Sequence, residues 1–148
     1  MNDITESFKL IKKLNANQKP SWGKMTSQYM VEHLYKMVQV SINEISLDIF
    51  TEERKISVLK KLFLGKRPLP KEFINPAIGP GLLPLEFADL KSAIEELEKI
   101  FNRYDQFFEA NPFMKTAHPV FGYLTKEEWD IFHKKHCHHH MSQFGLIE

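Results

Sequence analysis

The sequence predicts an all-α fold, a four-helix bundle, from three observations. Apolar residues recur every three or four positions in several long segments, which is the spacing of one face of an α-helix. A capping-box pair, Thr125 with Glu128, marks a helix start in the last part of the chain. We find no β-strand pattern of useful length. We therefore expect one helical domain over residues 1–148.

Four segments are expected to form the bundle, at about residues 3–15, 25–43, 86–110 and 125–144. Asp3 and Thr26 are the expected N-caps of the first two helices, and Gly145 is expected to end the last one. The segment 86–110 has the clearest pattern, a 3-4 spacing without a miss. Its apolar residues are Phe87, Leu90, Ile94, Leu97, Phe101, Tyr104 and Phe108.

A long crossover is predicted between the second and third bundle helices, with an extra short helix at 51–64. The apolar residues of that short helix are Ile56, Leu59, Leu62 and Phe63. The stretch "GKRPLPKEFINPAIGPGLLPL" that follows holds five prolines and three glycines, which excludes a long regular element. Because it is also rich in Leu, Ile and Phe, we expect an ordered strap over the bundle.

Composition excludes several classes of protein. Twenty basic and nineteen acidic residues give a net charge of +1, without the basic excess of a nucleic-acid binder. The single cysteine excludes an intrachain disulfide framework. No apolar run approaches the roughly 20 residues of a membrane span, and no signal peptide is visible. We expect a cytoplasmic protein without nucleic-acid or membrane partners, and a homodimer remains open.

The stretch "HKKHCHHHMSQFG" contains five of the seven histidines and can be a metal site, a tag or a solvated helix. Only three of its histidines are consecutive and the tract is in phase with an amphipathic helix, which argues against a tag. On a helix, His140 lies about 40° and Trp129 about 20° from His136, so both histidines point inward. His138 lies about 200° away and is expected to face water.

His136 and His140 are four residues apart, so their Cβ atoms should lie roughly 5–6 Å from each other. Two such rings can bind one ion at about 2.0–2.1 Å. His33 lies on the apolar face of the second helix, where a lone histidine is more often a hydrogen-bonded core residue. Three neutral imidazoles converging in one core would be costly to leave unpaired, so a shared divalent ion is the favoured interpretation.

Two further residues are candidates for a part in catalysis. His133 lies beside the expected ligand face and can act as a proton shuttle, support a ligand or replace one. The alternative is a partly buried histidine with a local hydrogen bond. Gln143, one turn beyond His140, can orient the site or bridge to a neighbouring helix.

Four other side chains have a structural interpretation that competes with a functional one. Cys137 can be a nucleophile, but its position favours a small buried hydrophobic residue. His118 can line the mouth of a pocket or lie in a surface loop. Trp22 can be a core residue or a substrate contact, and the core role is favoured. Tyr104 can likewise be a core residue or donate a hydrogen bond into the cavity, and again the core role is favoured.

Two segments resemble the DinB-like superfamily. The matching positions are Trp22, Met25, Thr26 and His33, followed by His136, His140 and Gln143. The stretch "HPVFGYLTKEEWDIFHKKHCHHHMSQFGLI" looks like an uncharacterised branch of that superfamily. The resemblance implies a four-helix bundle with a long crossover after the second helix, and a divalent metal held by His33, His136 and His140. Characterised relatives include metal-dependent transferases and isomerases that use low-molecular-weight thiols.

The first functional hypothesis is therefore a metal-dependent enzyme, a thiol transferase or a hydrolase acting on a small molecule. Its cofactor would be one divalent ion of zinc, nickel or iron, and a low-molecular-weight thiol is a possible partner. The second hypothesis is a non-catalytic bundle that binds the metal or a small ligand. The third is a purely structural bundle whose histidines bind no metal.

Overall fold

The computed structural model describes residues 5–23, 25–69 and 84–147. This part of the chain is mostly helical, with five helices and one small two-stranded sheet. The elements follow one another as α1 (Thr5–Ile11), α2 (Ser27–Ser41), α3 (Glu53–Leu64), α4 (Leu90–Ala110), β1 (Thr116–His118), β2 (Gly122–Leu124) and α5 (Lys126–Gln143).

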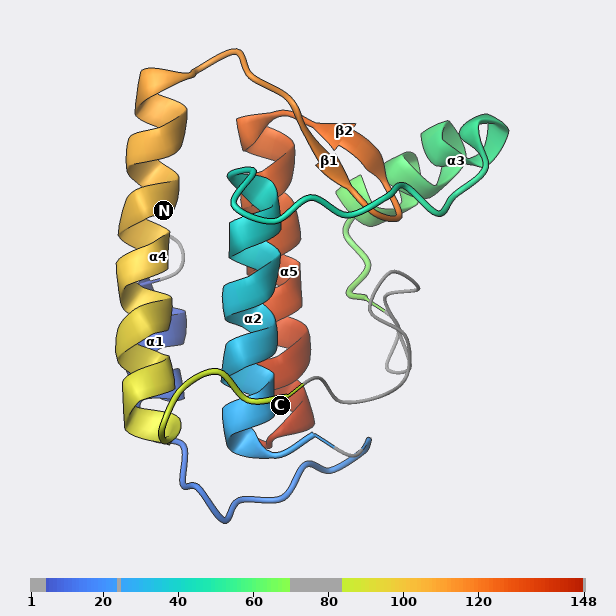
Figure 1. Cartoon of the computed structure of the whole chain (residues 1–148). Helices are drawn as coiled ribbons and strands as arrows, with labels where there is room; N and C mark the ends of the chain where they lie inside the picture. The colour runs from blue at the N-terminus through green and yellow to red at the C-terminus, as the bar shows by residue number, and fades with distance from the viewer. Residues whose placement is uncertain (1–4, 24, 70–83, 148) are drawn as a thin grey trace.

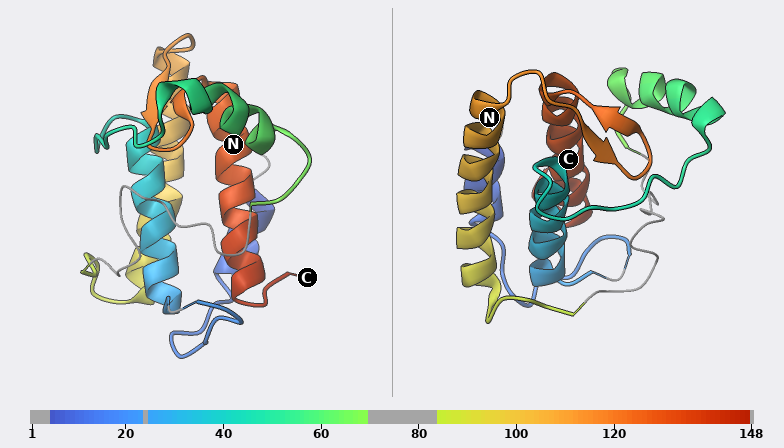
Figure 2. Two further views of the ribbon diagram at one scale, coloured as in Figure 1. Left: turned by 90° about the vertical axis from the view of Figure 1, so that its right-hand side faces the viewer. Right: turned by 45° about the horizontal axis from the view of Figure 1, so that its top comes forward.

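The three long helices α2, α4 and α5 stand side by side, and α3 projects from one end of them (Figure 1). The short α1 lies behind α4 in this view and contacts α5. In the two rotated views α2 and α5 again run next to each other, with the hairpin and α3 above their ends (Figure 2). The element that holds His33 is thus the direct neighbour of the element that holds the C-terminal histidines.

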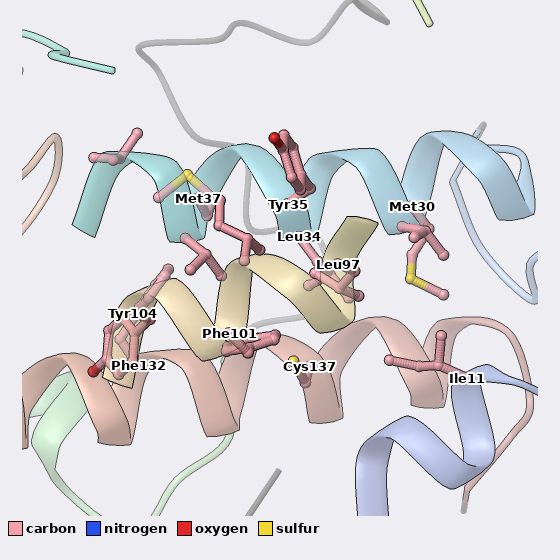
Figure 3. Close-up of a cluster of buried hydrophobic side chains, with 14 of the residues drawn as sticks. Ile11, Met30, Leu34, Tyr35, Met37, Leu97, Phe101, Tyr104, Phe132 and Cys137 are labelled. Carbon is pink, nitrogen blue, oxygen red and sulfur yellow. The ribbon is translucent and has the colours of Figure 1, made fainter. Parts of the chain in front are cut away.

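The core lies between α2, α4 and α5, with Ile11 added from α1 (Figure 3). The predicted apolar seam of α4 is buried at every position except Phe87, which is half-buried. That residue precedes the helix, because the Asp89 side chain accepts a hydrogen bond from Ser92 N at 2.8 Å and begins α4 at Leu90. The expected start at residue 86 was therefore four residues early.

The start of α2 and both ends of α5 agree with their predicted caps. Thr26 caps α2 by accepting from Tyr29 N at 3.2 Å. The capping box of Thr125 and Glu128 begins α5. Gly145 ends α5 at a φ of 72°, in the left-handed region that favours glycine.

Helix α1 is shorter than expected and ends at Ile11, not at residue 15. The predicted cap Asp3 lies outside the described residues. Beyond the helix the chain continues in turns, and Asn15 accepts from Ser27 Oγ through its carbonyl at 2.7 Å. A polar contact between α2 and the chain after α1 thus replaces the last predicted turn.

Helix α3 begins at Glu53 and buries less than its pattern suggested. Among its four predicted core residues only Phe63 is buried, while Leu62 is 63% exposed. The helix touches the rest of the protein along one edge, where the Lys135 ammonium of α5 donates to the carbonyls of Phe63 and Gly65. Most of the predicted strap after α3 lies outside the described residues, so its order stays a prediction.

A β-hairpin is present where we expected no strand. β1 and β2 pair antiparallel, with Thr116 opposite Leu124 and His118 opposite Gly122. Each strand has three residues, too few for an alternating pattern to be recognised in the sequence. Thr116 anchors the hairpin, because its hydroxyl donates to Ser41 O at 2.8 Å and accepts from Trp129 Nε1 at 2.7 Å.

Within the described part of the chain, none of the helices has both the length and the apolar character needed to cross a bilayer.

Candidate metal centre

The histidines predicted to share an ion meet between α2 and α5. His33 lies in the second turn of α2, and His136 and His140 lie on consecutive turns of α5. The spacing of four residues puts the two α5 rings on one face, 4.8 Å apart between ring centroids. The His33 ring faces both of them from α2, at 4.7 and 5.1 Å. We call these three residues the three-histidine cluster.

The same nitrogen of each ring points into the cluster. Nε2 of His136 lies 2.9 Å from Nε2 of His33 and 3.1 Å from Nε2 of His140. In a tetrahedral zinc site with bonds of about 2.0–2.1 Å, ligand nitrogens lie about 3.3 Å apart. These two separations are close to this value and all three ligand nitrogens lie within 4.8 Å of one another, so side-chain movements could place them around one ion.

The chemistry of the three nitrogens also fits a cation. A neutral imidazole nitrogen either donates one N–H or accepts through one lone pair, so the central Nε2 of His136 cannot serve both neighbours well. A divalent ion accepts three lone pairs at once. Among the described residues, this cluster is the sole group of three or more His, Cys, Asp or Glu side chains close enough to share an ion.

Burial keeps the rings of the cluster neutral. Desolvation, with a smaller contribution from the nearby His139, lowers the pKa of His33 to about 4. Desolvation also lowers the pKa values of His136 and His140 well below their usual range, and the neighbouring imidazoles add to the effect. Metal ligation requires neutral imidazole, so the cluster has the right protonation state at neutral pH.

Access to the cluster differs between its members. His136 and His140 are buried, at 3% and 6% exposure, and the His136 ring stacks on Phe132 with centroids 5.1 Å apart. His33 is half-buried and keeps contact with solvent. His33 is therefore the most solvent-accessible member of the cluster.

Comparison with known proteins gives a family without a known activity. The sequence model of the family described as "Protein of unknown function (DUF1569)" matches residues 1–145. The chain belongs to the DUF1569 family. No curated protein and no solved structure matches it significantly.

Gln143 contacts the cluster of this DUF1569 protein directly. Its Oε1 lies 2.7 Å from Nδ1 of His140, and its Nε2 donates to the backbone carbonyl of Trp22 at 2.9 Å. The contact with His140 matches the orienting role, whereas the expected bridge to a neighbouring helix is instead a bridge to Trp22 in the loop before α2.

His133 belongs to a separate environment. Its Nε2 lies 3.0 Å from Oγ of Ser41 on α2, and its ring stacks on Trp129 at 5.2 Å. The Ser41 hydroxyl donates its proton to Val38 O, so it accepts from His133. The structure does not bring His133 into the three-histidine cluster.

The prediction for His118 was wrong. It neither lines a pocket mouth nor lies in a surface loop, but is fully buried at 0% exposure at the end of β1. Its Nδ1 accepts from the backbone N–H groups of Val120 and Phe121 at 2.9 and 3.2 Å. The hairpin, which the sequence did not predict, turns this residue inward.

Three other candidates have structural surroundings. The Cys137 thiol turns toward α4 between Leu97 and Phe101 (Figure 3), and burial raises its pKa to about 12, so it is protonated and inert. Tyr104 is a core residue whose hydroxyl donates to Asp130 Oδ1 at 2.7 Å. Trp22 is half-buried and is thus less enclosed than the core residue we expected.

His139, which was not among the predicted site residues, lies beside the cluster. Its ring lies 4.9 Å from that of His140 and 6.0 Å from that of Trp22, edge to face in both cases. It donates a hydrogen bond to the backbone carbonyl of Leu69, at the start of the predicted strap. Its angle on the helix, about 60° from His136, was the feature of the sequence that could have indicated this position. His138, in contrast, is exposed as predicted.

Proposed function

We propose that this protein holds one divalent ion of zinc, nickel or iron at His33, His136 and His140. We further propose that it uses the ion in a thiol-dependent transfer or a hydrolysis of a small molecule. In this proposal the DUF1569 chain is a member of the DinB-like superfamily, and α1, α2, α4 and α5 are the helices of a four-helix bundle. The crossover between α2 and α4 carries α3.

The convergence of three Nε2 atoms from two helices carries the proposal. His33 and His136 are 103 positions apart in the chain, yet their nitrogens lie 2.9 Å apart. Three like nitrogens aimed at one point are unfavourable without a proton or a cation between them. An ion bound by three protein ligands keeps a position for water or substrate, as catalytic zinc sites do.

The three histidines have two roles in this proposal. His136 and His140 are the buried ligands from α5, and half-buried His33 is the ligand on the side that keeps contact with solvent. A divalent ion there would lower the pKa of a bound water or thiol and polarise a carbonyl group. Three neutral ligands leave the site with a charge of about +2, which favours an anionic substrate group such as a thiolate.

The thiol would come from the substrate, because the chain's own cysteine is unsuited to the role. Cys137 is buried against α4 and its pKa is raised to about 12. The imidazole of His139 is an additional polar ring beside the site, with its centroid 4.9 Å from that of His140. It can donate or accept a hydrogen bond at the edge of the site.

Metal analysis of the purified protein tests the site. We expect about one zinc, nickel or iron ion per chain after metal supplementation, and its loss in His33→Ala, His136→Ala and His140→Ala. His138→Ala is the matched control, since this histidine is exposed on the same helix and should leave the metal content unchanged. Metal-free wild-type protein after supplementation would contradict the site, and metal retained by the triple variant would mean that the ligands are wrong.

Thermal shift with low-molecular-weight thiols separates an enzyme from a binding protein without thiol chemistry. We expect a thiol to raise the melting temperature of the metal-loaded protein and to leave that of the metal-free protein unchanged. Indifference of the loaded protein to every thiol would exclude the transferase form of the proposal and favour the non-catalytic alternative.

A further inference from the structure

The environment of His140 differs from that of His136 in one respect. Nδ1 of His140 contacts Gln143 Oε1 at 2.7 Å, whereas Nδ1 of His136 is buried and has no hydrogen-bond partner among the described residues. Two ligands on the same helix face are therefore held in different ways, one by a side chain and one by packing alone.

The orientation of the Gln143 amide follows from its second contact. The backbone carbonyl of Trp22 can only accept, so the amide group that faces it at 2.9 Å must be the NH2. The oxygen of the amide then faces His140. An amide oxygen can only accept, so His140 carries its proton on Nδ1 and presents the lone pair of Nε2 to the cluster.

Gln143 is itself held against the loop before α2. Its backbone carbonyl accepts from Ser21 N at 2.7 Å, and its neighbour Phe144 accepts from the Gln18 side chain at 2.6 Å. The loop approaches the amide closely at Gly23, where φ is +80° and an added Cβ would lie 2.7 Å from Gln143 Nε2. Glycine is required here both by the positive φ and by the position of the amide.

We infer that Gln143 is a positioning residue which, anchored on the Trp22 carbonyl across Gly23, selects the metal-binding tautomer of His140. The inference rests on the proposed metal site and adds to it a residue that orients one ligand. The loop of residues 18–23 thereby contributes to metal affinity without contacting the ion. His136 has no equivalent partner in the described part of the chain, so the contact between Gln143 and Trp22 acts on one ligand, His140.

Cobalt titration of variants tests this role. Gln143→Leu removes both the acceptor for His140 and the donor to Trp22 at nearly constant size, and should weaken Co²⁺ binding by about 10- to 100-fold. Gln39→Leu is the matched control, because it makes the same chemical change on α2 beside Glu44, away from the histidines. Gly23→Ala, which displaces the amide without removing it, should weaken binding by less than Gln143→Leu.

Nitrogen chemical shifts of the imidazole rings provide a direct readout of the tautomer, both in the wild type and in Gln143→Leu. In the metal-free wild-type protein, His140 should carry its proton on Nδ1, and Gln143→Leu should lose this preference. A proton on Nε2 of His140 in the wild type would overturn the inference, as would equal Co²⁺ affinity of Gln143→Leu and Gln39→Leu. Failure of the wild type to bind Co²⁺ would instead contradict the proposed metal site.

Discussion

Two groups of buried histidines in this protein differ in what their ring nitrogens face. In the three-histidine cluster, Nε2 atoms of His33, His136 and His140 point at one another. In the second group, which we call the hairpin-side pair, His118 accepts from backbone N–H groups and His133 contacts a hydroxyl. Apart from half-buried His33, the rings of both groups are buried, but only the first group directs its ring nitrogens at a common point.

The comparison shows that a lowered pKa does not by itself mark a metal site. Burial lowers the pKa of His133 to about 3 and that of His118 well below its usual range, as it does in the cluster. In the hairpin-side pair, one nitrogen of each ring has a hydrogen-bond partner from the protein, while Nε2 of His118 is buried without a partner among the described residues. The geometry of the ring nitrogens therefore carries more information about function than their protonation does.

Acid should destabilise the metal-free protein more than any single substitution. Each buried ring has a folded-state pKa below its unfolded value of about 6.5, so the unfolded chain takes up protons first as the pH falls. Stability is then complete above pH 6.5 and declines toward pH 4 by up to about 1.4 kcal/mol per pH unit for each ring. Urea unfolding at pH 7.5 and 5.5 measures the loss.

The metal sharpens this pH comparison between the two groups. Ligation should hold the cluster rings neutral and protect the loaded protein over part of the range, while the hairpin-side pair titrates as before. Stability that does not change between pH 7.5 and 5.5 in the metal-free protein would show that neither group is buried as a neutral ring.

Metal loading should produce the next largest effect. A ligand at 1,000 times its dissociation constant stabilises the folded state by about 4 kcal/mol. We expect a divalent ion to raise the melting temperature of the wild type and of His133→Ala, and to have no effect on His33→Ala. Thermal melts with and without chelator measure the increment. Loss of the increment in His133→Ala would mean that the two groups are not separate.

Removal of a histidine ring should lower the unfolding free energy of the metal-free protein more in the hairpin-side pair than in the three-histidine cluster. His133→Ala leaves a cavity beside Trp129 and removes the donor to Ser41, at a cost of about 2–4 kcal/mol. His136→Ala should cost less, because it also relieves the contact of three like nitrogens. Equilibrium urea unfolding of both metal-free variants gives the difference, and a greater loss in His136→Ala would contradict it.

Ser41→Ala should have the smallest effect. It removes the hydroxyl that accepts from His133 and leaves a small gap, so we expect a loss of about 1 kcal/mol in unfolding free energy. Co²⁺ affinity should remain within twofold of the wild type. A tenfold change in affinity would mean that the hydrogen bond of the hairpin-side pair is coupled to the cluster.

The sequence by itself determined the features that depend on neighbours within a few residues. The 3-4 spacing of apolar residues predicted the core face of α4, and the Thr125–Glu128 pair predicted the start of α5. The same periodicity put His136 and His140 on one inward face and His138 in solvent. These features follow from helix geometry and local capping, which are properties of short segments.

Contacts between distant segments were decided by the tertiary structure. The hairpin buries His118, and the loop before α2 provides the carbonyl that orients the Gln143 amide. The separation of His133 from the cluster depends on a serine 92 positions away. A helical pattern gives the direction of a side chain but not its partner, because the partner comes from whichever element packs opposite.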